Sequence, residues 1–333
     1  MESDPPQAIS FGTIDYIGNV SIDENGHYRL GDSAMRTFEP LALPVNLVPS
    51  KQRILLTKPH LFYQHPKHLD SILDTCLLAG RIDALSAADV IAWRGMLTKI
   101  LLGIELALHV SWIDEKLYME EEDPKPNYRR QRYDDSAANG MAFEDVFTEN
   151  LEPGANKGQW GNVVSRNLGT MSLLYGGEVD GVRPPENGRL STRERRIELK
   201  SRKLNTKSQN TARWHIQSSL IGVHEIFVGH RTDSDQIIKA ESIIVSDIHM
   251  TSRAASAHAL LTKLRNLTRD ASRDENSIWK VILKKGDIVQ VTELGPTQVS
   301  KVKGRRDDPR SPVKRIGIVP QRVIEALRAG REA

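Results

Sequence analysis

Hydrophobic residues recur at helical spacing in several segments of this chain. Positions three and four residues apart share one face of a helix, so an apolar stripe with this spacing predicts a helix packed against a core. The segments with this pattern are 68–79, a helix from Ser86 past Leu101, the region around Phe143, 214–219, 254–267 and 319–330. Helices are therefore expected in six separate segments of the chain.

Other segments alternate apolar and polar residues with a period of two, which predicts strands. They are residues 104–120, 171–180, 195–200, 221–229 and 278–291. Glycine and proline interrupt residues 1–60, where short strands and turns are expected, and residues 123–136 are expected to form a charged loop. The mixture predicts an α/β (α+β) fold with a mixed central β-sheet flanked by helices.

No long linker divides the 333 residues, so a single domain is expected over residues 1–333. Its two ends, residues 1–26 and 329–333, are expected to be poorly ordered. A hydrophobic content of 39% supports a real core. An acidic run at residues 120–123 is expected to be a solvated turn before Pro124.

The net charge of +3 permits a nucleic-acid partner without requiring one. Its distribution is more informative, because residues 193–213 hold eight Lys/Arg against two acids and residues 301–315 hold seven against two. The single cysteine, Cys76, excludes an internal disulfide and favours a reducing compartment, either nucleus or cytosol. No signal peptide or membrane span is expected.

Four carboxylates and a lysine are the residues best suited to chemistry. Glu178 and Asp180 are two positions apart, as are Glu198 and Lys200, and residues at i and i+2 point to one face of a strand. A hairpin of the two segments would bring Asp180 near Glu198, and Glu144 adds a carboxylate from a predicted helix. Divalent cations such as Mg²⁺ and Mn²⁺ prefer oxygen ligands and can activate water. The set predicts a metal-dependent phosphodiesterase.

Short charged pairs are weak evidence alone, because 27% of the residues are charged. An exposed strand with alternating charges explains any one pair, Lys200 alone fits a surface cation, and Gln217 fits a buried amide satisfied by backbone. Apolar neighbours favour a site, because Val179 flanks Asp180 and Ile197 precedes Glu198. A buried charge is costly unless it is paired or binds metal.

Asp180 together with Glu198-Leu199-Lys200 has the pattern of the PD-(D/E)xK nuclease superfold. Further segments narrow the resemblance. They are Trp93-Arg94-Gly95 with Leu97-Thr98-Lys99, Gly140 to Glu144, Glu178-Val179-Asp180, Glu198-Leu199-Lys200, Trp214 to Ser218 followed by Val228 to Arg231, and Pro320 to Leu327. In order and spacing they resemble the motifs of the DXO-type family of decapping and 5′-end-processing nucleases, which includes the fungal partners of the nuclear 5′→3′ exonuclease.

The resemblance implies a PD-(D/E)xK nuclease-like core and a role for each motif residue. The implied ligands of one or two Mg²⁺ or Mn²⁺ ions are Glu144, Glu178, Asp180, Glu198 and the backbone carbonyl of Leu199. The implied catalytic residues are Glu144, Glu178, Asp180, Glu198, Lys200 and Gln217. The implied substrate contacts are Trp93, Arg94, Gly95, Glu178, Lys200 and Gln217. Gly161 and Gly181 stand where family members often carry cysteine, which leaves the substrate preference open.

The implied activity is metal-dependent hydrolysis at RNA 5′ ends in mRNA quality control. Its substrates would be incomplete or unusual caps, such as unmethylated guanosine or NAD caps, or the pyrophosphate of 5′-triphosphate RNA. The bonds would be phosphodiester or acid-anhydride bonds, and 5′→3′ degradation of the remaining RNA is left open. The basic segments would hold the RNA backbone, and no membrane partner is implied.

Two other functions stay open from the sequence. One is a DNA nuclease of the same superfold, against which the motifs at Arg94, Glu144 and Gln217 argue. The other is a stabilising partner of a 5′→3′ exoribonuclease with little activity of its own, against which the intact acidic set argues. The expected location is the nucleus, with the cytosol as the alternative.

Overall fold

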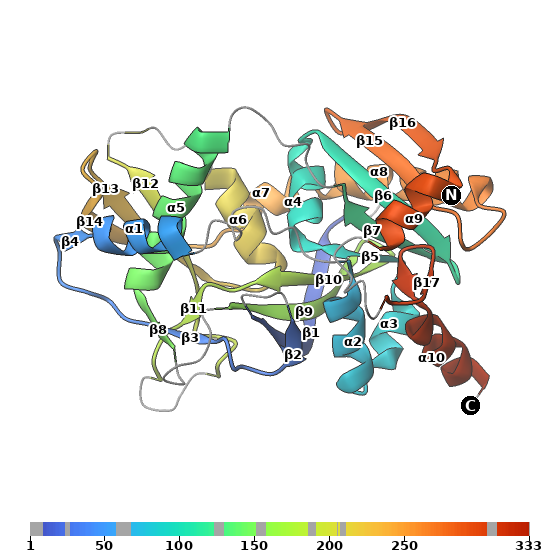
Figure 1. Cartoon of the computed structure of the whole chain (residues 1–333), viewed down its shortest axis with the longest axis horizontal. Helices are drawn as coiled ribbons and strands as arrows, with labels where there is room; N and C mark the ends of the chain where they lie inside the picture. The colour runs from blue at the N-terminus through green and yellow to red at the C-terminus, as the bar shows by residue number, and fades with distance from the viewer. Residues whose placement is uncertain are drawn as a thin grey trace, which may run out of the picture.

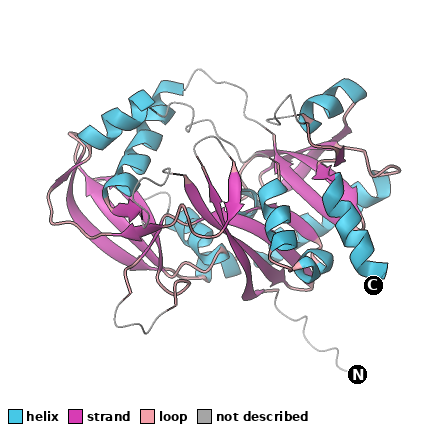
Figure 2. Ribbon diagram, turned by 60° about the horizontal axis from the view of Figure 1, so that its bottom comes forward, coloured by secondary structure: helices cyan, strands magenta, loops and turns pink. Residues whose placement is uncertain are grey.

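The structure is a computed structural model that describes residues 9–23, 27–57, 68–122, 130–150, 158–185, 191–204, 206, 211–304 and 312–332. Two large β-sheets lie side by side, and helices cover their faces (Figures 1 and 2). The described residues are therefore arranged as a mixed α/β fold, as the sequence predicts. Within them, no helix is long and apolar enough to cross a membrane.

The larger sheet has nine strands in the order β16-β15-β6-β7-β5-β10-β9-β1-β2. Their bounds are β1 Phe11–Ile22, β2 Tyr28–Leu30, β5 Val90–Trp93, β6 Leu106–Ile113, β7 Lys116–Glu121, β9 Gln159–Leu168, β10 Met171–Glu178, β15 Trp279–Lys284 and β16 Asp287–Glu293. Most pairs are antiparallel, but β5 runs parallel to both neighbours, β10 and β7. The sheet is therefore mixed at its centre.

The second sheet has seven strands in the order β4-β14-β13-β12-β11-β3-β8. Their bounds are β3 Arg36–Phe38, β4 Val45–Asn46, β8 Thr148–Asn150, β11 Gly181–Val182, β12 Arg196–Lys203, β13 Glu225–Arg231 and β14 Gln236–Ile244. A small pair, β17 (Arg315–Ile316) and β18 (Val319–Pro320), lies near the C-terminus. The chain passes directly from β10 in the first sheet to β11 in the second, so residues 178–181 join the two sheets.

The helices form layers on both sheets (Figure 1). Their bounds are α1 Val48–Thr57, α2 Asp70–Leu78, α3 Ile82–Ala87, α4 Arg94–Leu102, α5 Arg130–Val146, α6 Thr211–Leu220, α7 Ile248–Thr251, α8 Ala254–Ala271, α9 Pro296–Lys303 and α10 Gln321–Glu332. Helices α4, α6 and α8 share a core with one face of the nine-stranded sheet, and α2, α3 and α10 share a core with the other. Helices α1 and α5 pack on the seven-stranded sheet.

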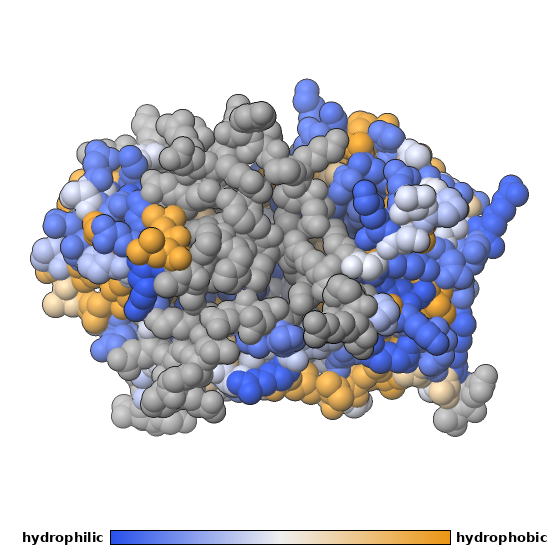
Figure 3. Space-filling model, in the orientation of Figure 1, coloured by the Kyte–Doolittle hydropathy of each residue, from blue (hydrophilic) through white to orange (hydrophobic). Residues whose placement is uncertain are grey.

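The surface outside the cores is largely hydrophilic over the right-hand side of the face in Figure 3, with hydrophobic residues in small groups. The most exposed large hydrophobic side chains of the described residues, Leu56, Ile244, Leu78 and Ile248, come from four different elements. Scattered apolar residues of this kind are normal on a soluble domain.

The helix predicted to start at Ser86 is wrong in its first half. Residues Val90–Trp93 form strand β5, and the helix begins at Arg94. Val90 packs into the core under α4 and α8, whereas Ile91 packs into the opposite core under α2 and α3. A strand buried on both faces is a continuous apolar run, which periodicity cannot separate from a helix.

Other expectations also change at strand β1 and strand β7. Residues 11–22, expected to be poorly ordered or broken into short strands, form the long strand β1 paired with β9. The acidic run is not a solvated turn over its first residues, because Glu120 and Glu121 complete β7 and Glu120 is only 2% exposed. Asp123 and Pro124 lie outside the described residues.

Candidate active site

Strand β12 presents apolar and charged side chains to opposite faces. Ile197 and Leu199 are fully buried in the core that α5 covers, so Glu198 and Lys200 point to the other side of the sheet. The side chain of Glu198 is 2% exposed and that of Lys200 is 21% exposed. The prediction that these two residues share one face of a strand is confirmed.

Asp180 lies in the segment that joins the two sheets. Its Oδ2 atom accepts a 2.7 Å hydrogen bond from the backbone N–H of Leu199 and lies 3.1 Å from Nζ of Lys200. Lys200 Nζ also lies 2.8 Å from Oε1 of Glu198. One ammonium group therefore bridges the two carboxylates that the sequence predicts to be neighbours.

The predicted route to this contact needs a correction. Strand β10 does not pair with β12; the hairpin consists of β11 and β12, with Gly181 opposite Ile197. Glu178 stays in the nine-stranded sheet as the last residue of β10, opposite Gly161 of β9. A change of sheet between two carboxylates cannot be read from periodicity, because both segments alternate like strands.

Arg94 and Gln217 border the acidic residues from two helices. Arg94, the first residue of α4, has Nη1 3.5 Å from Oε2 of Glu198 and 3.5 Å from the backbone oxygen of Gln217. Arg94 is 9% exposed, so this positive charge is almost buried beside the carboxylates. The Trp93-Arg94-Gly95 motif is thus placed at the junction of β5 and α4.

Glu144 comes from helix α5, as predicted, and a glycine sets the position of that helix. The neighbouring Phe143 is fully buried and stacks at 6.0 Å on the Phe227 ring of β13. A Cβ atom on Gly229 would lie 2.3 Å from the Phe143 ring. The missing side chain of Gly229 therefore lets α5 lie close to the sheet with Glu144 at its end.

The four carboxylates also affect one another's pKa values through their charges. Burial and the nearby charge of Asp180 raise the pKa of Glu178 to about 7 and raise the pKa of Glu144 well above its usual range. Burial and the charge of Glu198 likewise raise the pKa of Asp180. Burial also acts to raise the pKa of Glu198, but Lys200 and Arg94 outweigh it and hold that pKa below its usual value.

These residues fit a divalent cation by their chemistry. Among the residues that the structure describes, no group of three or more His, Cys, Asp and Glu side chains is already arranged to hold a metal ion, and Lys200 lies between Asp180 and Glu198. The four carboxylates outnumber the three cations near them, Lys200, Arg94 and Arg36, and three of the carboxylates have raised pKa values. An excess of carboxylate oxygens is the donor set that Mg²⁺ or Mn²⁺ takes.

A cavity of about 400 Å³ opens beside the acidic residues. Glu178, Arg94 and Gln217 line it together with Trp93 and Gly95. The other lining residues include Met96, Lys99, Glu120, Glu121, Gln159, Trp160, Gly161, Gly176, Gly177 and Arg213. All of the predicted substrate contacts except Lys200 therefore lie on the wall of one cavity.

Some cavity residues were not predicted from the sequence. Gln159 donates from Nε2 to Oε2 of Glu178 at 3.3 Å, and Arg213 adds an exposed cation one turn before Gln217 on α6. Trp160 adds an aromatic wall, and its indole N–H donates to Asp32 at 3.0 Å. Only their positions in the sequence could have indicated these residues. Arg213 directly precedes the Trp214 to Ser218 motif, and Trp160 precedes Gly161, where family members often carry cysteine.

An aspartate beside a Glu-x-Lys strand, next to a mixed sheet, is the arrangement of a PD-(D/E)xK-type nuclease centre. The model of the family described as RAI1-like PD-(D/E)XK nuclease matches residues 15–312. The chain therefore belongs to that family, as the resemblance predicts.

Individual relatives agree with the family match. The decapping nuclease RAI1 of Yarrowia lipolytica is 25% identical over 338 residues, covering 87% of this chain and 90% of the relative. The crystal structure of Scheffersomyces stipitis Rai1 in complex with (3′-NADP)⁺ and calcium superposes with a TM-score of 0.68 at 14% identity, covering 98% and 99%. Candida albicans Rai1 in complex with pU5 and Mn²⁺ gives 0.66 at 15% identity, covering 98% and 99%. At these identities the structures show a shared fold.

Proposed function

We propose that this protein is a metal-dependent RNA 5′-end hydrolase that removes incomplete or unusual caps, or pyrophosphate, from RNA. The observation that carries the proposal is the contact of Asp180 and Glu198 with one lysine, beside a cavity lined by Glu178, Arg94 and Gln217. Buried carboxylates and a lysine next to a cavity are what hydrolysis of a phosphate ester or anhydride requires.

Glu144, Glu178, Asp180 and Glu198 are the residues that would hold one or two Mg²⁺ or Mn²⁺ ions, with the carbonyl of Leu199. When bound, such ions lower the pKa of water and neutralise charge on phosphate oxygens. Asp180 is held in place by the Leu199 N–H, so the carboxylate is oriented before substrate arrives. Lys200 supplies a cation for the scissile phosphate or the attacking water, and Gln217 offers an amide to the same groups.

The cavity supports a substrate that carries phosphate next to an aromatic group. Its wall carries three cations, Arg94, Lys99 and Arg213, and two indole rings, Trp93 and Trp160. Three glutamates share the wall, and Lys99 is paired with one of them, Glu121. Relatives of the same fold have been crystallised with pU5 and Mn²⁺ and with (3′-NADP)⁺ and calcium, which supports RNA 5′ ends and dinucleotide caps as candidates here. Guanidinium groups bind phosphate in a fixed geometry.

A partner exoribonuclease and a nuclear location belong to the same proposal. The resemblance to fungal exonuclease partners supports the first, and the single buried cysteine fits the reducing compartment of the second. Co-purification of the tagged full chain from nuclear extract, with an exonuclease identified by mass spectrometry, would support the partner role. Recovery of the active protein alone would favour a free-standing enzyme.

The test uses RNAs that differ only at the 5′ end: monophosphate, triphosphate, unmethylated cap, methylated cap and NAD cap. Each is incubated with Mg²⁺ or Mn²⁺ and with wild type, Asp180→Asn or Glu198→Gln. We expect metal-dependent release of the 5′ group by wild type alone. Asp233→Asn is a matched control, because it neutralises an exposed carboxylate in the turn between β13 and β14, outside the acidic set. Activity on DNA but on no RNA would instead support the alternative nuclease.

A further inference from the structure

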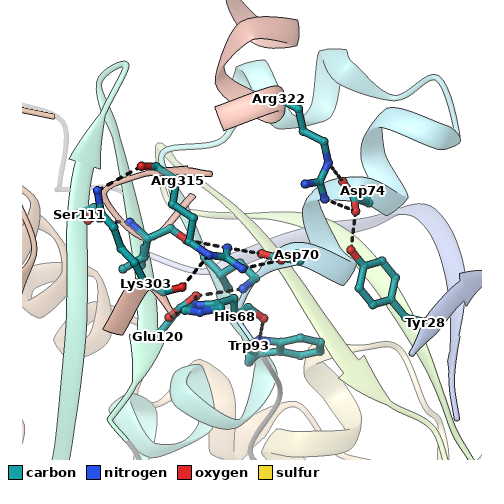
Figure 4. Close-up of polar contacts among 12 residues, drawn as sticks. Tyr28, His68, Asp70, Asp74, Trp93, Ser111, Glu120, Lys303, Arg315 and Arg322 are labelled. Carbon is teal, nitrogen blue, oxygen red and sulfur yellow. Dashed lines mark hydrogen bonds and ion pairs between the residues drawn. The ribbon is translucent and has the colours of Figure 1, made fainter. Parts of the chain in front are cut away.

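A buried pair, His68 and Glu120, lies at the edge of the cavity, where Glu120 forms part of the wall. Figure 4 shows the two side chains next to each other, with Trp93 beside His68. His68 is 1% exposed and Glu120 is 2% exposed. Nδ1 of His68 lies 2.9 Å from both Oε1 and Oε2 of Glu120, and the backbone N–H of Leu69 donates to Oε1 at 3.0 Å. One carboxylate at the end of β7 therefore fixes both the ring and the main chain just before α2.

His68 is linked by a hydrogen bond to Trp93, which lines the cavity. The indole N–H of Trp93 donates to the backbone oxygen of His68 at 3.3 Å. The Trp93 ring lies against Gly176, where an added Cβ atom would be 3.1 Å from the ring. Both Trp93 and Glu120 line the cavity, and Trp93 is followed by Arg94, which contacts Glu198.

We infer that Glu120 and His68 act as positioning residues: they hold Trp93, and with it the start of α4, in the orientation that binds substrate. The inference rests on the proposed function, because it concerns the same cavity. A buried carboxylate costs free energy unless its hydrogen bonds are made, so this arrangement is fixed only while both partners are present. Among the residues that the structure describes, Nε2 of His68 has no hydrogen-bond partner, so the contacts described for the ring are those of Nδ1.

A second buried ion pair nearby offers a matched control. Arg315 of β17 makes two contacts with Asp70 of α2, at 2.7 and 2.8 Å, and its side chain is 0% exposed. Figure 4 shows this pair close to His68. Neither Arg315 nor Asp70 lines the cavity. Loss of this pair should lower stability without disturbing substrate binding.

The experiment compares Glu120→Ala, Glu120→Gln and Asp70→Asn in the full-length protein with capped RNA and Mn²⁺. We expect Glu120→Ala to raise KM about tenfold while kcat changes less than about threefold, because a wall that binds substrate is displaced. Glu120→Gln keeps an oxygen for the Leu69 N–H and the His68 ring, so its KM should stay within about threefold of wild type. Asp70→Asn should lower Tm and leave KM unchanged.

A second readout needs no catalytic activity. The protein has five tryptophans, so 5-fluorotryptophan labelling gives five ¹⁹F signals, and Trp93→Phe assigns one. The Trp93 signal should shift in Glu120→Ala and stay in place in Asp70→Asn. The inference is overturned if Glu120→Ala changes neither the ¹⁹F signal of Trp93 nor KM. It is also overturned if Asp70→Asn raises KM as much as Glu120→Ala does. If wild type cleaves no RNA, the proposed function fails while the ¹⁹F signals still decide the positioning role.

Discussion

Asp180 accepts a hydrogen bond of 2.7 Å from the backbone N–H of Leu199, so a carboxylate from the junction between the sheets is fixed by the main chain of the seven-stranded sheet. The donor is a backbone N–H, so an uncharged side-chain oxygen at position 180 can also accept this hydrogen bond. The contact places Asp180 beside Lys200 and Glu198 with a geometry that a neutral analogue can keep. A variant that keeps this hydrogen bond and removes the charge can therefore distinguish the effect of Asp180 on stability from its effect on catalysis.

Asp180→Asn is therefore expected to stabilise the metal-free protein and abolish activity. Asparagine keeps an oxygen for the Leu199 N–H but removes a buried charge whose pKa is raised by burial and by Glu198. A gain in unfolding free energy of about 1 kcal/mol and a rate loss of at least about 100-fold are expected. Urea unfolding in chelator and RNA turnover in Mn²⁺ measure the two. A less stable variant would contradict this account of the charge.

Lys200→Met should have the opposite effect on stability. Its ammonium group contacts Asp180 and Glu198, and its loss leaves buried carboxylates without their nearest cation. We expect a loss of about 3 kcal/mol in chelator, because removing one partner of a buried pair leaves an uncompensated charge. Thermal unfolding checks this, with Lys203→Met, an exposed lysine on the same strand, as the control. Equal Tm values for the two variants would show that Lys200 carries no such role.

Gly229→Ala is predicted to displace helix α5 and with it Glu144. The new Cβ would lie 2.3 Å from the Phe143 ring, a distance that requires movement of the ring or the helix. Overpacking of this kind costs about 1–3 kcal/mol, and a shifted Glu144 should also weaken Mn²⁺ binding. Calorimetric titration measures the second effect. Restoration of Mn²⁺ affinity in Gly229→Ala/Phe143→Leu would support this cause, and wild-type affinity in the single variant would exclude it.

His215 should make the protein less stable in acid. Its Nδ1 accepts a 3.0 Å hydrogen bond from the Ser246 N–H, and burial, with a smaller effect of His249, lowers the pKa of the ring. The unfolded state therefore takes up a proton first, so stability is full above the unfolded pKa of about 6.5 and falls as pH decreases below it.

The check compares urea unfolding of wild type and His215→Asn at pH about 7.5 and about 5, since asparagine offers an acceptor that does not titrate in this range. The difference in stability between the two pH values should be smaller in the variant. The same difference in both proteins would assign the acid sensitivity to other groups.

The sequence predicted helices and strands correctly where the apolar residues followed one clear spacing. Helix α8 and the strand pair around Lys285-Gly286 match their predicted segments, because α8 has a single buried face and the strand pair has a clear turn. Helices α2 and α6 match as well, although consecutive residues of both helices are buried. The prediction was wrong at Val90–Trp93, because a strand buried on both faces has no alternation of apolar and polar residues. It was also wrong at Glu120 and Glu121 of β7, which were expected in a solvated turn. The carboxylate of Glu120 is buried because His68 lies against it, and no local pattern identifies a partner 52 residues away.

Sequence motifs identified the residues of the candidate site but did not predict how the fold brings them together. The sequence could place Glu198 and Lys200 on one face because i and i+2 geometry is local. The passage of the chain between two sheets at Asp180 could not be predicted, since it depends on which strands pair. Gln159 and Trp160 reach the cavity through β9, whose pairing with β10 is a long-range property of the fold.

A single assay of cap release tests whether these carboxylates bind a divalent cation and whether the protein then hydrolyses RNA 5′ ends. RNA labelled in an unmethylated guanosine cap is incubated with wild type or Glu198→Gln, with and without Mn²⁺, and the released label is identified by chromatography. We expect release of the cap only by wild type and only with Mn²⁺. Equal release by Glu198→Gln, or release in the presence of chelator, would contradict it.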